Sequence, residues 1–161
     1  MHGMGTFTWE SGSTYTGEWR FNKKNGNGTM VYKDGSVYDG WWKDDKRDGE
    51  GFISFSDGKT YEGTFRNDLR DGQGKYTWEN KCTYTGNWEQ GRRAGHGEIT
   101  YPDGSSYVGS FKDNRREGTG IFTFKDGSKY TGEWVNDAKS GKGEITWQDG
   151  KVFTGLFKKD L

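Results

Sequence analysis

Residues 26–42 read GNGTMVYKDGSVYDGWW, and this stretch contains every feature that recurs along the chain. It holds a Gly-x-Gly pair (Gly26 and Gly28), an aromatic residue (Tyr32), a turn dipeptide (Asp34-Gly35) and the motif Tyr38-Asp39-Gly40-Trp41-Trp42. The same order recurs seven times at a constant step of 23 residues, which accounts for all 161 residues. A fixed period of this length is the signature of a repeat array, so the fold is deduced from one unit and its neighbours.

Three columns of aromatic residues and one series of Gly-x-Gly pairs keep this step. The units begin near residues 3, 26, 49, 72, 95, 118 and 141, and we expect one array over residues 1–161. The first aromatic of each motif forms the tyrosine column: Tyr15, Tyr38, Tyr61, Tyr84, Tyr107, Tyr130 and Phe153. Four residues later comes the tryptophan column: Trp19, Trp42, Phe65, Trp88, Phe111, Trp134 and Phe157. Before each turn lies the third ring column: Trp9, Tyr32, Phe55, Trp78, Tyr101, Phe124 and Trp147.

The composition is that of a thin, ring-rich fold. The chain has 28 Gly and a total of 27 Trp, Tyr and Phe, but few aliphatic residues. Lys and Arg together equal Asp and Glu at 24 each, so no bulk attraction to nucleic acid is indicated. The single Cys excludes an intrachain disulfide and fits a reducing compartment, which predicts a cytoplasmic protein.

Hydrophobic alternation predicts strands. Residues 28, 30 and 32 and residues 38, 40 and 42 form one inward face, whereas residues 29, 39 and 43 face water. The two strands share a face only across an odd-numbered loop, so we expect a three-residue turn at 33–35 with Gly35 left-handed. The next connection needs an even loop, and we expect six residues, 43–48. This register sets Gly28 opposite Gly40 and Gly40 opposite Gly51.

The predicted fold is an all-β, elongated, single-layer antiparallel sheet of stacked hairpins with about 14 strands. A glycine stripe crosses every strand, and glycine inside a strand costs stability, so a ring is expected to cover the bare backbone. Rows of rings beside a glycine floor predict an aromatic groove.

These residues resemble the MORN repeat (membrane occupation and recognition nexus), whose hallmark is Tyr-x-Gly-x-Trp followed by Gly-x-Gly at a step near 23. The resemblance implies an elongated antiparallel sheet of hairpins whose groove takes up partner segments. It also implies a place in flagellar radial spokes or other cytoskeletal assemblies.

Nothing in the sequence has the pattern of a catalytic, cofactor or metal site. His2 and His96 lack Cys, His or carboxylate partners at metal-ligand spacing, and the Gly-x-Gly pairs lack the third glycine of a dinucleotide fingerprint. We therefore expect a non-enzymatic scaffold or adaptor without cofactors. The groove is expected to bind a helical or extended protein segment, because aromatic residues are common at binding hot spots. The candidate groove residues are Tyr15, Trp19, Tyr32, Tyr38, Trp42, Phe55, Tyr61, Phe65, Trp78, Tyr84, Trp88, Tyr101, Tyr107, Phe111, Phe124, Tyr130 and Trp134.

A basic column precedes the Gly-x-Gly pairs and predicts an alternative function. Stacked in loops along one edge of the sheet, it would bind anionic phospholipid headgroups at the inner face of a membrane. Carboxylates scattered among these bases weaken that alternative. Open sheet edges predict self-association with another copy. The column, called the basic ladder below, consists of Lys24, Arg47, Arg70, Arg93, Arg116 and Lys139.

The fourth unit departs from the pattern, because Asn80-Lys81 replaces Asp-Gly. Lysine adopts the left-handed conformation at a cost, so a strained or altered turn with a local bulge is expected there. The adjacent Cys82 is interpreted as an incidental surface residue.

Overall fold

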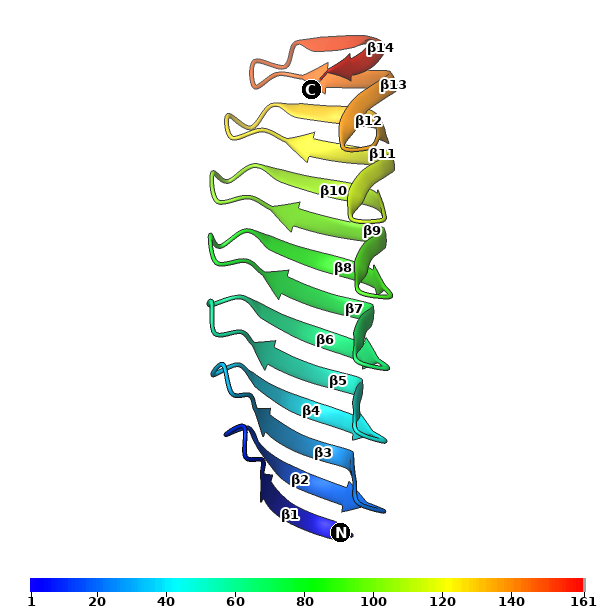
Figure 1. The fold of residues 1–161 in the computed structure, drawn as a ribbon. Coiled ribbons are helices and arrows are strands. Elements are labelled where there is room, and N and C mark those ends of the chain that lie inside the picture. The colour runs from blue at the N-terminus through cyan, green and yellow to red at the C-terminus, as the bar shows by residue number, and fades with distance from the viewer. Residues whose placement is uncertain (161) are drawn as a thin grey trace. The chain divides into compact units, whose positions relative to one another are not determined.

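The computed structural model describes residues 1–160, with side chains up to Lys158, and is entirely β (Figure 1). Fourteen antiparallel strands follow one another in chain order in an open meander, which confirms the predicted fold class. The described residues contain no helix, and hence none that could cross a membrane.

The strands fall into two compact units, Met1–Glu79 and Asn80–Leu161. Strands in the first unit are β1 (Gly3–Thr8), β2 (Thr14–Arg20), β3 (Lys23–Val31), β4 (Val37–Lys43), β5 (Lys46–Ser54), β6 (Thr60–Arg66) and β7 (Leu69–Thr77). Strands in the second unit are β8 (Thr83–Glu89), β9 (Arg92–Thr100), β10 (Ser106–Lys112), β11 (Arg115–Thr123), β12 (Lys129–Val135), β13 (Ala138–Thr146) and β14 (Val152–Asp160).

The predicted register and first turn are confirmed. Gly28 lies opposite Gly40, and Met30 lies opposite Tyr38. The amide of Gly35 donates to the carbonyl of Tyr32 at 2.9 Å, and Gly35 has a φ of 87°. The connection is therefore a three-residue loop whose left-handed position is filled by glycine.

The six-residue loop predicted at 43–48 is wrong. Strands β4 and β5 continue to a two-residue turn at Asp44 and Asp45, which both have positive φ, 47° and 69°. Such a turn matches the strand twist. The remaining residues form a bulge on β5, which shifts the register between Gly40 and Trp42. On the far side of the bulge, Gly40 lies opposite Gly51, as predicted. The shift amounts to two residues, so the parity that set the inward face is preserved.

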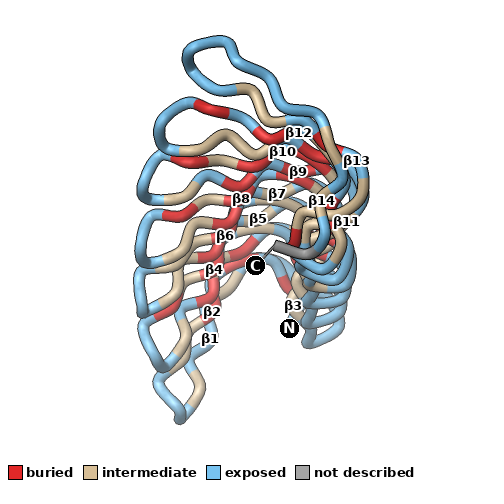
Figure 2. Tube along the Cα trace, turned by 90° about the horizontal axis from the view of Figure 1, so that it is seen from above, coloured by how far each residue is buried: buried red, intermediate tan, exposed pale blue. Residues whose placement is uncertain are grey.

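Repeated bulges bend the strands, and the core lies in the bend. A bulge adds residues to one strand of a pair and makes it curve. Figure 2, viewed along the stack, shows the hairpins as arches, with buried positions recurring from strand to strand. The predicted faces are confirmed here, because Met30, Tyr38 and Trp42 are buried whereas Asp39 and Lys43 are exposed.

The fourth turn keeps the geometry of the others. Lys81 adopts a φ of 68° in the left-handed region, and Asn80 accepts a hydrogen bond from the amide of Cys82, as Asp34 does from Ser36. The expected strain therefore lies in the conformation of Lys81. The surface position expected for Cys82 is wrong, since only 7% of the residue is exposed. It lies immediately before β8, and burial raises the pKa of its thiol.

Candidate functional site

The tyrosine column supplies the inner layer of the fold. Tyr15 is fully buried, and its hydroxyl donates to the carbonyl of Glu18 at 3.1 Å. The ring lies along its own strand over Gly17, where a Cβ would be 2.6 Å from the Tyr15 Oη. The same contact and hydrogen bond recur in every unit with this tyrosine, which explains the glycine stripe. The other tyrosines of this set are Tyr38, Tyr61, Tyr84, Tyr107 and Tyr130.

The tryptophan column alternates with these tyrosines in edge-to-face contacts. Tyr15 contacts Trp19 of its own strand at 5.1 Å between centroids and Trp42 of the next unit at 5.4 Å. In the second compact unit (Asn80–Leu161), Tyr107 contacts Phe111 and Trp134 in the same way. Aromatic pairs favour this geometry, so each ring links neighbouring hairpins. The indole of Trp42 also donates to the carbonyl of Gly28 at 2.9 Å.

Most of the candidate groove residues are therefore core residues. Twelve of the seventeen belong to these two columns, and all twelve are buried. Their rings fill the place where a groove was predicted. The other five belong to the third ring column and are half-buried: Tyr32, Phe55, Trp78, Tyr101 and Phe124.

Hollows open beside the half-buried rings at the three-residue turns. In the first unit, Tyr32 and Phe55 line one hollow with Ser36, Ile53 and Arg47. In the second unit, Phe122 and Phe124 line another with Ser105 and Asp126. Each hollow combines aromatic surface with hydroxyl or charged groups, a combination typical of small recognition sites.

The basic ladder lies on this inner face, and each of its members is the second residue of a strand instead of part of a loop. The guanidinium of Arg116 lies 4.3 Å from the centre of the Trp134 ring, and the ammonium of Lys24 lies 4.3 Å from that of Trp42. Arg47, Arg70, Arg93 and Lys139 lie over rings in the same manner. The predicted loop position of this column is wrong, because the preceding turn has only two residues.

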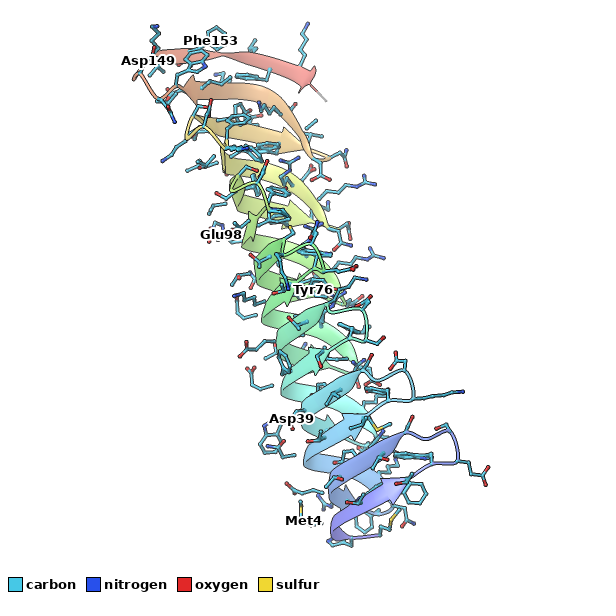
Figure 3. The ribbon with its side chains drawn as sticks, turned by 90° about the vertical axis from the view of Figure 1, so that its left-hand side faces the viewer. Met4, Asp39, Tyr76, Glu98, Asp149 and Phe153 are labelled. Carbon is cyan, nitrogen blue, oxygen red and sulfur yellow. The ribbon has the colours of Figure 1, made fainter. Side chains whose placement is uncertain are left out.

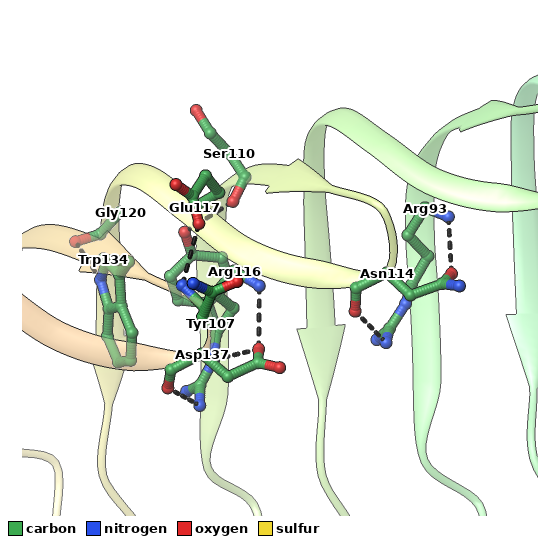
Figure 4. Close-up of polar contacts among 10 residues, drawn as sticks. Arg93, Tyr107, Ser110, Asn114, Arg116, Glu117, Gly120, Trp134 and Asp137 are labelled. Atoms are coloured by element: carbon green, nitrogen blue, oxygen red, sulfur yellow. Dashed lines mark hydrogen bonds and ion pairs between the residues drawn. The ribbon is translucent and has the colours of Figure 1, made fainter. Parts of the chain in front are cut away.

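Several rungs of the ladder are also bound to the turn of the following unit. The Arg116 Nε donates to an Asp137 carboxylate oxygen at 3.2 Å, and its terminal nitrogen donates to the Asp137 carbonyl at 2.7 Å (Figure 4). Arg47 binds Asp68 in the same way, and Arg93 binds Asn114. The amide of Lys24 donates to the Asp45 carboxylate at 2.8 Å. These contacts connect one unit to the next.

The remaining electrostatics follow from burial. Burial raises the pKa of Tyr15, Tyr84 and Tyr107 to about 12 and lowers that of Lys24. For Tyr15 the carboxylates of Glu18 and Asp45 raise the pKa further. These shifts belong to core groups, so they do not indicate an acid or base poised for catalysis.

The acceptors of three of these cations were not predicted from the sequence. Arg47 and Asp68, Arg93 and Asn114, and Arg116 and Asp137 are each 21 residues apart. A search for Asp or Asn at that constant separation would have identified them. Within the described part of the chain, no group of three or more His, Cys, Asp or Glu side chains could hold a metal ion.

Comparisons with known proteins agree with this architecture. The MORN repeat profile matches residues 1–14, 15–37, 38–60, 61–83, 84–106, 107–129 and 130–152. Among curated proteins no sequence match was found. The structure resembles the SAS-4 (dCPAP) TCP domain of Drosophila melanogaster, solved in complex with a proline-rich motif of Ana2 (dSTIL). That comparison has a TM-score of 0.54 at 15% identity and covers 96% of this chain and 90% of the other.

A second similar structure is the wild-type TCP10 domain of Danio rerio CPAP. Its TM-score is 0.56 at 13% identity, over 96% of this chain and 73% of the other. At these identities the likeness concerns the fold.

Proposed function

The chain belongs to the MORN repeat family, and on that premise we propose that it is a non-enzymatic scaffold that holds a partner polypeptide against its inner face. The resemblance described above adds a cytoskeletal or ciliary/flagellar assembly as the setting. The observation that carries the proposal is the third ring column, whose rings are half-buried beside hollows on the inner face.

The half-buried rings suit an extended segment. Polyproline-type and other extended peptides dock on aromatic surfaces because their backbone is already ordered and little entropy is lost. The SAS-4 TCP domain, which has a similar fold, was solved with a proline-rich motif. We therefore propose an extended segment as the occupant and the hollow at Tyr32 and Phe55 as one of its subsites.

The structure does not favour phospholipid binding by the basic ladder. The ladder cations that would carry it lie over rings, and several also bind carboxylates or carbonyls of the next unit. Pairing of two copies through sheet edges stays a prediction, which a mass measurement in solution checks.

The test is quantitative affinity purification from the native source with two double variants. Tyr32→Ser with Phe55→Ser removes the rings of the first hollow, whereas Val108→Ser with Ile121→Ser removes two exposed side chains, 37% and 42% accessible. We expect the first variant to lose its partners by about tenfold, as for hot-spot residues, and the second to retain them. A partner segment identified in this way is then titrated against both variants.

Both variants are checked for an unchanged β-sheet circular dichroism spectrum before the comparison. The proposal is overturned if the folded Tyr32/Phe55 variant keeps every partner, because its rings would then serve only the core. Equal losses in both variants would also contradict it.

A further inference from the structure

Two positions in the first compact unit (Met1–Glu79) depart from the 23-residue pattern with large exposed aromatic side chains. Trp41 is 49% exposed, and the residues at the same place in nearby 23-residue repeats are Glu18, Thr64 and Asn87. Phe52 is 42% exposed, whereas the preceding repeat has Thr29 at this place and the following repeat has Lys75. The adjacent repeats fold with polar residues at these places, and the other apolar residues there, Ile121 and Leu156, are aliphatic, so the array itself does not require the two aromatic rings.

Both rings project from the outer face, opposite the buried columns. Asp39 and Trp41 alternate with the inward-facing Tyr38, Gly40 and Trp42 on β4. Figure 3 shows Asp39 projecting from the opposite side of the sheet to Tyr76. Phe52 lies directly opposite Asp39, so it belongs to the same face.

Three carboxylates lie next to the two rings on the outer face. Phe52 lies between Asp39 of β4 and Glu62 of β6 in the strand register. Glu50 comes two residues before Phe52 on β5, within the bulge opposite Trp41. Residues two apart on one strand share a face, so Glu50 lies beside both rings. We call Asp39, Trp41, Glu50, Phe52 and Glu62 the outer patch.

The groups of the outer patch have spare binding capacity. Among the described residues, neither Trp41 nor Phe52 takes part in a ring–ring or cation–ring contact, unlike the rings of the inner face. The carboxylates of Asp39, Glu50 and Glu62 form no ion pair within the same part of the chain. Asp39 accepts one hydrogen bond, from the Thr29 hydroxyl at 2.9 Å. The neighbouring cations on this face are Lys75, opposite Glu62 on β7, and Lys43, two residues after Trp41 on β4.

We propose that the outer patch binds a basic polypeptide segment through arginine side chains. A guanidinium stacks on an exposed indole or phenyl face and donates hydrogen bonds to a carboxylate, so one arginine uses both kinds of group in the patch. The charge sign separates this surface from the inner face, where the rings are covered by Lys24, Arg47 and Arg70 of the chain itself. The outer patch thus gives the scaffold a second docking face, and the proposal does not depend on the occupant of the inner face.

The test is a fluorescence titration of the whole chain with a labelled synthetic peptide of alternating arginine and serine. A peptide of alternating glutamate and serine is the charge-reversed probe. We expect the arginine peptide alone to bind, with a Kd that rises steeply with salt. Trp41→Thr and Phe52→Thr, which copy Thr64 and Thr29, are each expected to weaken binding by about tenfold.

The matched control is Val108→Thr with Ile121→Thr, which removes an exposed apolar pair of the second unit and should leave the Kd unchanged. Replacing Asp39, Glu50 and Glu62 by their amides provides a second route that leaves both rings in place and should weaken binding equally. The proposal is overturned by an absence of arginine-peptide binding at low salt. It is equally overturned by equal binding of the glutamate peptide, or by binding that survives both the ring and the amide variants.

Discussion

At the scale of single residues, the fold rests on the fit between one tyrosine and two glycines. The Tyr84 ring occupies the space above its own Gly86 and above Gly97 of the next strand, where a Cβ would be 2.5 Å from the ring. Its hydroxyl remains satisfied by the Asn87 carbonyl at 2.8 Å. A buried hydroxyl without a partner would be costly, so the ring and the hydrogen bond act together. The glycine stripe is thus explained by packing rather than by turn conformation.

The fourth turn provides a prediction at this scale. Lys81 holds the left-handed conformation that glycine holds at the equivalent Gly35, Gly58 and Gly104, and nothing lies within 4 Å of a Cβ at those glycines. The cost at Lys81 is therefore conformational. Lys81→Gly should stabilise the chain by about 1 kcal/mol, measured as the free energy of unfolding in urea.

The matched control is Gly104→Lys, which places lysine in the same conformation at a φ of 87° and should cost about as much as Lys81→Gly contributes. An unchanged stability in Lys81→Gly would mean that the lysine side chain compensates for its backbone strain.

At the scale of strands and turns, several residues of the basic ladder connect neighbouring repeats within each compact unit. Arg116 contacts the Trp134 ring, the Asp137 carboxylate and the Asp137 carbonyl, and its side chain is only 19% exposed. A cation held between a ring and a carboxylate contributes more than an exposed ion pair, because water screens it less. We therefore infer that the basic ladder stabilises the packing of one 23-residue repeat against the next.

Arg116→Ala should therefore lower the free energy of unfolding by about 2 kcal/mol, through loss of the ring contact and the hydrogen bonds to Asp137. Arg116→Lys should cost less, because Lys24 and Lys139 occupy equivalent rungs over rings. Arg115→Ala is the control, since that side chain makes one exposed hydrogen bond to Asn136 and should change stability by less than about 0.5 kcal/mol. Equal changes in the free energy of unfolding for Arg115→Ala and Arg116→Ala would contradict the stabilising role of the basic ladder.

Parity explains how much of this geometry the sequence could predict. The alternation of Tyr38, Gly40 and Trp42 determined the inward face and the glycine pairing, and both are confirmed. The connection at 43–48 could not be resolved, because a six-residue loop and a two-residue turn with a two-residue register shift have the same parity. The ring columns were indistinguishable for a related reason, since all three face inward. In the structure the tyrosine hydroxyl reaches the carbonyl three residues on, and the tryptophan column is buried by its edge-to-face contacts with those tyrosines.

At the scale of the whole molecule, the buried tyrosines predict a cooperative loss of structure at high pH. The pKa of Tyr15, Tyr84 and Tyr107 is raised to about 12 from an ordinary value of 10.0, and burial also raises that of Tyr38, Tyr61 and Tyr130. A raised folded-state pKa means that the unfolded chain releases these protons first. The stabilisation is therefore complete below pH 10 and is lost as the pH rises toward 12.

We expect a titration of tyrosinate absorbance to show few of the nine tyrosines ionising near pH 10. The rest should ionise together with loss of the β-sheet circular dichroism signal, since repeats that share interfaces unfold together. Tyr107→Phe, which copies the natural Phe153, removes one of the linked protons and should make the pH dependence of stability shallower. Ionisation of all tyrosines near pH 10 with the sheet signal intact would contradict the buried role of this column, because the hydroxyls would then have to be reached by water in the folded chain.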